Sequence, residues 1–156
     1  MVSHIYLMLS LPEENIISQG TQQEVNHVYF IAQGTCDVIV LNHMKQKDPK
    51  PQPLQQGNFF GEVSLLFPCL RTATVKSQNY CTLAYLRKDN FIELWAYSPD
   101  TFHEIEEHAL RYDDKWIQFK IKLLMQIDYF EAERNNHEFF VKIQYHMQEM
   151  IYQKGN

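Results

Sequence analysis

The chain has 156 residues, of which 45% are hydrophobic, so it is long enough to bury one core and little more. With a formal net charge of −5 and 14 Lys and Arg scattered along it, the chain lacks the basic patch of a protein that binds nucleic acid. No apolar run approaches the ~18 residues of a membrane span, and no basic segment leads into an apolar one at the N-terminus. We therefore expect a cytoplasmic chain that does not insert into a membrane.

The three cysteines and seven histidines favour neither a metal centre nor a catalytic centre. Cys36, Cys69 and Cys81 are odd in number and lack CxxC spacing, which argues against a disulfide framework and a zinc site and fits a reducing compartment. His103 and His108 are five residues apart, so a helix does not stack them on one face, and we interpret the histidines as surface or core-edge residues. No local spacing suggests a nucleophile with its base. We expect no enzyme, no metal and no cofactor.

Short apolar segments separated by turn residues predict β-strands in the first half of the chain. The segments Val28–Ile31 and Cys36–Val40 flank Gly34, which is the pattern of two antiparallel strands joined by a turn. From Asn42 to Pro53 the chain is polar, with three prolines and three lysines. This composition predicts an exposed loop between strands.

Residues 59–75 place one glutamate and one arginine nine positions apart in an otherwise apolar, turn-interrupted stretch. A charge on Arg71, which has apolar neighbours, is costly to bury without a partner. Glu62 is one candidate partner. The segment Gly61–Leu66 also predicts the start of a short helix, whose free backbone N–H groups attract an anion. The residue types leave two interpretations open, an internal Glu62–Arg71 salt bridge and a site for an external anion.

Two strands and two helices are predicted after this stretch. Thr72–Lys76 and Cys81–Leu86 alternate as strands, and apolar spacing predicts a helix over Asp89–Tyr97, which Pro99 ends. A second helix is predicted from Asp100, with acidic residues favoured near its start by the helix dipole. Its apolar face would carry Phe102, Ile105, Ala109, Tyr112 and Trp116.

The run from Phe60 to Val75 closely resembles the phosphate-binding cassette of cyclic nucleotide-binding domains. The residues that carry the resemblance are Phe60-Gly61-Glu62, Ser64, Leu65-Leu66 and Arg71-Thr72-Ala73-Thr74-Val75, with the family's spacing between Gly61 and Arg71. Threonine after the arginine looks most like the domains of cyclic-nucleotide-regulated cation channels. The resemblance implies an α+β fold, in which an antiparallel β-roll (jelly roll) carries a short cassette helix and C-terminal B and C lid helices. A helical tail follows these helices and is not part of the fold that the resemblance implies.

The resemblance also assigns roles to individual residues. Arg71 would pair with the cyclic phosphate, because its planar guanidinium suits two oxygens at once. Glu62 would accept a hydrogen bond from the ribose 2′-hydroxyl, and the region of Gly61 and Ser64 would offer backbone amides. Thr72 would donate to the phosphate or accept a hydrogen bond from a guanine amino group. The other ligand-binding residues implied in the cassette are Phe60, Val63 and Ala73.

Lys115 and Trp116 stand near the positions where channel-type relatives place a basic and an apolar residue of the C helix over the purine. Trp116 offers a ring face for stacking, and Lys115 offers a charge. The alternatives are core packing of an amphipathic helix for Trp116 and a solvated face for Lys115. The sequence does not decide between them.

We predict a cyclic nucleotide-binding domain over residues 1–122, with its first helix missing, and a helical tail over residues 123–156. The ending Glu149–Asn156 is similar to Glu14–Thr21, which predicts the start of a second such domain in a tandem array. Coincidence between short amphipathic segments is the alternative. Helices of the tail are expected to cover an incomplete N-terminal edge of this chain or of a neighbouring one, as in a homo-oligomer.

The resemblance implies a regulatory sensor that binds cAMP or cGMP and passes closure of the C helix to an attached or neighbouring effector domain, by resemblance an ion channel. This would place the chain at the inner face of a membrane through flanking segments. The alternative is a ligand-free scaffold or interaction domain in which Arg71 pairs with Glu62. A bacterial-type transcription regulator would require a basic helix-turn-helix after the C helix, which the acidic, aromatic tail does not supply.

Overall fold

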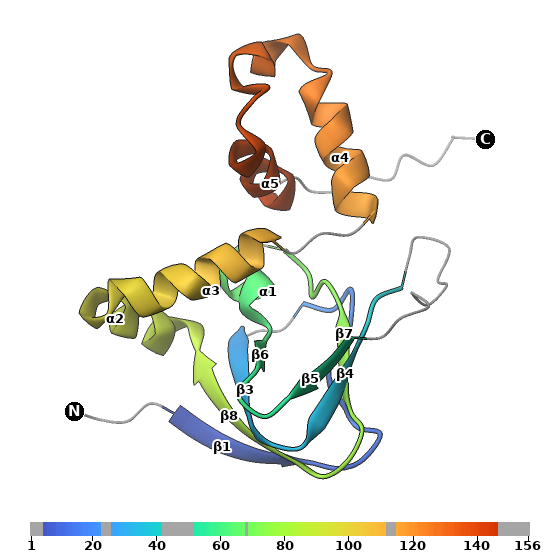
Figure 1. Cartoon of the computed structure of the whole chain (residues 1–156), viewed down its shortest axis with the longest axis vertical. Helices are drawn as coiled ribbons and strands as arrows, with labels where there is room; N and C mark the ends of the chain where they lie inside the picture. Colours follow the sequence, from blue (N-terminus) through green and yellow to red (C-terminus); the bar gives the residue numbers. More distant parts are fainter. Residues whose placement is uncertain (1–4, 23–25, 42–51, 68, 112–114, 147–156) are drawn as a thin grey trace. The chain divides into compact units, whose positions relative to one another are not determined.

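A computed structural model describes residues 5–22, 26–41, 52–67, 69–111 and 115–146, which fall into two compact units, residues 1–112 and 113–156. The first unit contains strands and three helices among its described residues (Figure 1). The strands are β1 (Ile5–Ser10), β2 (Asn15–Ile17), β3 (His27–Gln33), β4 (Thr35–Ile39), β5 (Gln52–Gln55), β6 (Phe59–Phe60), β7 (Thr74–Ser77) and β8 (Cys81–Arg87). The helices are α1 (Glu62–Leu66), α2 (Lys88–Tyr97) and α3 (Pro99–Arg111).

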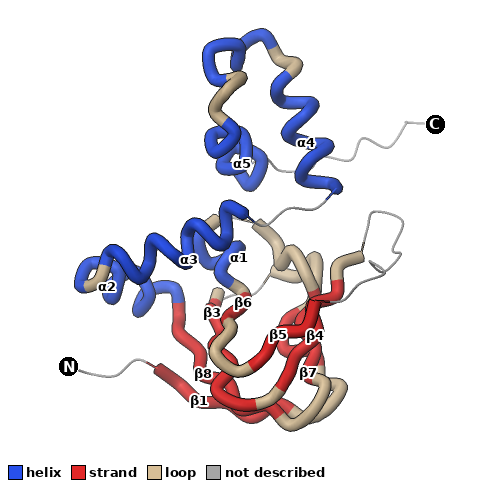
Figure 2. Tube along the Cα trace, in the orientation of Figure 1, coloured by secondary structure: helices blue, strands red, loops and turns tan. Residues whose placement is uncertain are grey.

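The strands form two four-stranded sheets, in the orders β1-β8-β3-β6 and β2-β7-β4-β5. Every strand pair is antiparallel, and β3 and β8 form the centre of the first sheet. Figure 2 shows the strands of this unit gathered together, with α1, α2 and α3 to one side of them. The described strands stay in two open sheets and do not close into one barrel. The predicted antiparallel jelly roll with helices is therefore confirmed.

The first hydrophobic core lies between the two sheets. It forms because successive side chains of a strand point to opposite faces, so that Tyr29 and Ile31 of β3 share the interior with Val75 of β7 and Leu83 of β8. Tyr29 stacks on Phe60 of β6, with 5.1 Å between the ring centroids. This contact attaches the strand that leads into α1 to the inside of the roll.

The second core lies between the first sheet and the helices. Val28, the β3 residue beside Tyr29, is fully buried on this side and packs with Leu65 of α1, Phe91 of α2 and Phe102 of α3. The rings of Phe91 and Phe102 meet edge to face, with centroids 4.5 Å apart. Through this core, α1 is held between the sheet and α3.

The expected loop over Asn42–Pro53 is wrong at its end, because β5 begins at Gln52 and includes Pro53. β5 is an edge strand that pairs only with β4 in its sheet, and an edge position tolerates a proline that cannot donate to the ladder. Residues 42–51 lie outside the described part of the chain.

The described residues of the second unit form α4 (Lys115–Met125), the 3₁₀ helix η1 (Asp128–Glu133) and α5 (His137–His146). The predicted helix from Asp100 corresponds to α3, and its continuation to Trp116 stays a prediction, because residues 112–114 lie outside the described part of the chain. The apolar residues of the two helices serve different cores: those of α3 face the sheet, whereas α4 packs against α5. The ending Glu149–Asn156 lies outside the described residues, and both the domain boundary after residue 122 and the second-domain hypothesis stay predictions.

Candidate ligand-binding site

The site begins at Gly61, where β6 passes into α1. Gly61 has a φ of 88°, in the left-handed region that favours glycine. A Cβ atom at this position would lie 2.8 Å from the backbone oxygen of His27 and 3.0 Å from Nη1 of Arg71. The chain therefore requires glycine here both for its backbone conformation and for the close approach of the arginine.

The guanidinium of Arg71 lies against the start of α1. Nη1 donates to Oγ of Ser64 at 2.8 Å and to the backbone oxygen of Gly61 at 3.0 Å, and both Nη atoms lie 3.4 Å from the backbone oxygen of His27. These three acceptors are neutral. The Arg71 residue is only 2% exposed, and burial lowers the pKa of its guanidinium from the ordinary value. The arginine and the cassette helix are thus brought together as the sequence resemblance implies.

Glu62, the first residue of α1, bonds to a residue that the sequence did not assign to the site. Its Oε1 lies 2.9 Å from Nδ1 of His108 on α3, and its side chain is 7% exposed. This hydrogen bond raises the pKa of His108 above its ordinary value, against the opposing effect of burial. Among the described residues no ion pair joins Glu62 to Arg71, so the internal salt bridge considered from the sequence is not what the structure contains.

The other predicted cassette residues contribute to the frame of the site. Phe60, Val63 and Ala73 are buried at 5–6% exposure, and Ser64 is buried at 3%. Thr72 is half-buried and follows Arg71 directly. Their roles toward a ligand stay predictions.

Lys115 and Trp116 begin α4, in the second unit, and their side chains lie outside the described part of the structure. Their predicted contacts with the base therefore stay predictions.

Two histidines belong to the site although sequence reasoning placed histidines at the surface or core edge. His27 supplies a backbone oxygen to Arg71, and burial, Arg71 and Arg87 lower the pKa of its imidazole. The side chain of His108 is 61% exposed, yet it bonds to Glu62. Glu62 and His108 are 46 positions apart, and no local spacing links them. Their pairing depends on the packing of α1 against α3.

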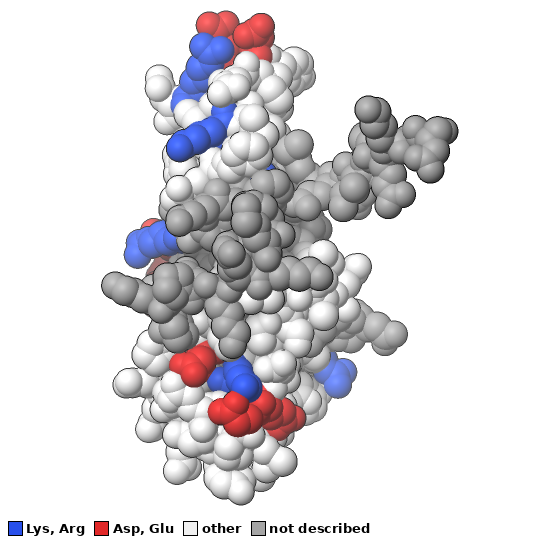
Figure 3. Space-filling model, turned by 90° about the vertical axis from the view of Figure 1, so that its right-hand side faces the viewer, with Lys and Arg blue, Asp and Glu red and all other residues white. Residues whose placement is uncertain are grey.

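Charged side chains of both signs lie next to one another on the described part of the face drawn in Figure 3. Lys76 of β7 forms an ion pair with Glu13, which lies in the turn before β2. The described residues contain no group of three or more His, Cys, Asp or Glu that could hold a metal ion. None of the described helices has the length and apolar content needed to cross a bilayer.

Sequence comparison identifies similar proteins for most of the chain. The profile of the family described as "Cyclic nucleotide-binding domain" matches residues 10–98. The human potassium/sodium hyperpolarization-activated cyclic nucleotide-gated channel 1 is 32% identical over 126 residues, which are 81% of this chain and 13% of the channel. The human channel 2 of the same name is 33% identical over 99 residues, or 64% of this chain and 10% of the channel. The chain thus spans about an eighth of the length of the channel 1 relative.

Solved structures share the fold at lower identity. A regulatory subunit of a cAMP-independent protein kinase A from Trypanosoma brucei aligns with a TM-score of 0.57 and 19% identity, covering 67% of this chain and 37% of that chain. The regulatory domain of Toxoplasma gondii PKA, crystallised with cAMP, aligns with a TM-score of 0.56 and 20% identity, covering 67% of this chain and 40% of that chain. These likenesses support the jelly roll with its helices.

Proposed function

The chain belongs to the cyclic nucleotide-binding domain family, and we propose that it binds cAMP or cGMP as a regulatory sensor module. The observation that carries this proposal is the position of Arg71, whose Nη1 lies 2.8 Å from Ser64 Oγ and 3.0 Å from the Gly61 oxygen. The guanidinium therefore lies against the short helix of the cassette, which supports a role for Arg71 in binding a phosphate there. A planar guanidinium can bind two oxygens of a phosphodiester together.

In the proposed complex, Arg71 donates to the charged oxygens of the cyclic phosphate. The phosphate brings a negative charge that the oxygens of Gly61, Ser64 and His27 lack, which favours this contact. Glu62 would accept from the ribose 2′-hydroxyl, and the backbone near Gly61 and Ser64 would approach the phosphate. Phe60, Val63, Thr72 and Ala73 complete the proposed cassette. Whether the ligand is cAMP or cGMP is a question for direct titration, because Thr72 suits both.

We further propose that α3 transmits binding to an attached effector. α3 contacts α1, which carries Glu62, so a rearrangement at the cassette reaches this helix directly. A shift from a few per cent to a large majority of one helix position requires a difference in affinity of roughly 3 to 5 kcal/mol between the two states. The similarity to gated channels makes an ion channel the proposed effector.

Replacement of Arg71 tests the binding proposal. Arg71→Ala should weaken binding of cAMP and cGMP by about 2 to 5 kcal/mol, the range for losing one member of a buried charge pair. Isothermal titration calorimetry on the whole chain measures this change. Because Arg71 also bonds to Gly61 and Ser64, circular dichroism must first show that the variant remains folded. Unchanged affinity in a folded Arg71→Ala variant would defeat the assignment.

A ligand-free scaffold is the second candidate, and one observation favours it. Arg71 and Glu62 both bond to groups of this chain, at 2.8 Å and 2.9 Å, so neither requires a ligand for the fold to form. Thermal unfolding separates the candidates. A nucleotide at about a hundred times its dissociation constant stabilises a binder by roughly 2.7 kcal/mol and must raise the unfolding midpoint. No shift with either nucleotide would favour the scaffold.

A further inference from the structure

His108 bonds to the carboxylate of Glu62, which the proposed ligand would contact through its ribose hydroxyl. The bond between His108 Nδ1 and Glu62 Oε1 measures 2.9 Å and joins α3 to the first residue of α1. The ring of Phe59, on β6, packs beside the imidazole, with centroids 4.9 Å apart. The Glu62 side chain is only 7% exposed in this arrangement, whereas that of His108 is 61% exposed. The imidazole is therefore the partner with more freedom to move, and it occupies the Oε1 atom that a ribose hydroxyl could otherwise use.

We infer that His108 is an internal competitor of the ligand: it occupies Glu62 in the ligand-free protein, and binding of a cyclic nucleotide breaks the His108–Glu62 pair. This inference rests on the proposed function, because it assigns to Glu62 the ribose hydroxyl of that ligand. Breaking the pair also removes the polar bond between α1 and α3. Binding of the nucleotide to the cassette would thereby release a bond that restrains α3.

The competition depends on pH in a defined direction. Glu62 of α1 favours the imidazolium form of His108, Arg111 of α3 opposes it, and β6 contributes the uncharged ring of Phe59. The pKa of His108 is raised in the paired state and returns toward about 6.5 when the pair opens. Protonation therefore stabilises the ligand-free state, and binding releases a proton. Affinity should be constant above the raised pKa, fall as pH decreases from there to about 6.5, and level off below it.

His27 does not produce the same dependence, although it lies near Arg71. Burial and the charges of Arg71 and Arg87 lower the pKa of its imidazole. The pKa values of His27 and His108 are thus shifted in opposite directions from the ordinary value. Comparison of the pH profiles of the wild type and His108→Ala between about 6 and 8.5 separates the contribution of His108 from that of His27.

Calorimetric titration of the whole chain with cAMP and with cGMP, at pH values from about 6 to 8.5, tests the inference. His108→Ala should bind about two- to fivefold more tightly than the wild type at the low end of this range, as expected for loss of a partly exposed ion pair. The affinity of this variant should not change with pH over the same range. His108→Gln can still donate to Glu62 but does not titrate, so it should bind with an intermediate affinity and a flat profile.

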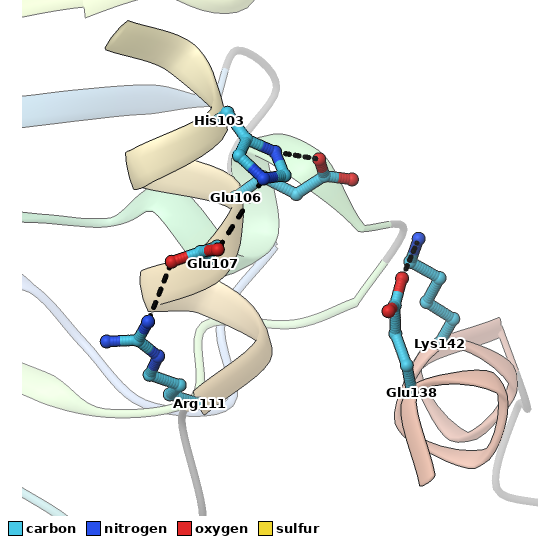
Figure 4. A network of polar contacts seen from close by, with 6 residues as sticks. All are labelled: His103, Glu106, Glu107, Arg111, Glu138 and Lys142. Carbon is cyan, nitrogen blue, oxygen red and sulfur yellow. Dashed lines mark hydrogen bonds and ion pairs between the residues drawn. The ribbon is translucent and has the colours of Figure 1, made fainter. Parts of the chain in front are cut away.

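His103→Gln is the matched control. His103 lies on the same helix with a 69% exposed side chain, and it faces Glu106 and Glu107 instead of the cassette (Figure 4). Glu107 also bonds to Arg111, at 2.7 Å, so this network stays on α3. The control should reproduce both the affinity and the pH profile of the wild type.

Three results would overturn the inference. Weaker binding by a folded His108→Ala variant would make His108 a residue that positions Glu62 for the ligand. An unchanged pH profile in that variant would assign the titration to another group. A His108 pKa, measured by NMR on the ligand-free chain, that is the same in the wild type and in Glu62→Gln would show that the pair does not form. That NMR test needs no ligand, so its failure is distinct from failure of either nucleotide to bind, which would remove the proposed function.

Discussion

Gly61 and Arg71 constrain each other, because the backbone of the first lies against the side chain of the second. The left-handed φ of 88° at Gly61 turns its carbonyl oxygen toward the guanidinium, and the space that a Cβ would fill contains Nη1 of Arg71 and the oxygen of His27. The glycine is therefore required at the same point where the arginine is buried. Substitution at either residue should disturb the other.

Gly61→Ala should destabilise the fold by about 1 to 3 kcal/mol, since it places an alanine in a strained backbone region and against two close atoms. Gly57→Ala is a matched control, because Gly57 has the same φ of 88° but no atom within 4 Å of the position that a Cβ would take. Chemical denaturation of both variants measures the difference. An equal loss of unfolding free energy in both variants would mean that the close approach of Arg71 and His27 to position 61 does not add to the destabilisation.

At the scale of single residues, the sequence grouped Arg71, Gly61 and Ser64 in one cassette, and in the structure Nη1 of Arg71 bonds to the other two. It did not identify the partner of Glu62. His108 is 46 residues away on another helix, and its position depends on how α3 packs. Such contacts follow from tertiary packing and leave no local pattern in the sequence.

The helices α2 and α3 are held to the first sheet by aromatic packing. Phe91 of α2 is 1% exposed, and its ring contacts those of Phe102 of α3 and Trp95, with centroid distances of 4.5 Å and 5.9 Å. The same core includes Leu65 of α1, the helix that carries Glu62. Loss of the Phe91 ring should therefore weaken the core in which α1 and α3 pack together.

Phe91→Ala should lower the free energy of unfolding by about 3 to 5 kcal/mol, the range for removing a buried aromatic ring. The adjacent Ile92 is 55% exposed, so Ile92→Ala should change stability by less than about 1 kcal/mol. Urea denaturation followed by circular dichroism compares the two variants. Similar losses from both would contradict the assigned core.

At the scale of elements, apolar patterns and turn residues predicted β3, β4, β7 and β8, and apolar spacing predicted α2. β1 was missed because Ile5–Ser10 is apolar at nearly every position, so it lacks the alternation that marks a half-buried strand. The residues on one of its faces remain exposed, with Leu7 at 73% and Leu9 at 77%.

In the molecule as a whole, a β-roll brings a buried arginine and a buried glutamate to a single short helix. We propose that both residues exchange partners within the chain for groups of a cyclic nucleotide. All the described contacts of this site lie within residues 1–112. The effector is part of the proposed function alone, since the chain spans 13% of the channel 1 relative.

A crystal structure of the chain grown with saturating cAMP or cGMP would test this exchange of partners. We predict that the cyclic phosphate bonds to both Nη atoms of Arg71, that the ribose hydroxyl bonds to Glu62, and that His108 is released from Glu62. A nucleotide bound elsewhere, or Arg71 still bonded to Gly61 and Ser64 with the cassette empty, would contradict the proposed exchange.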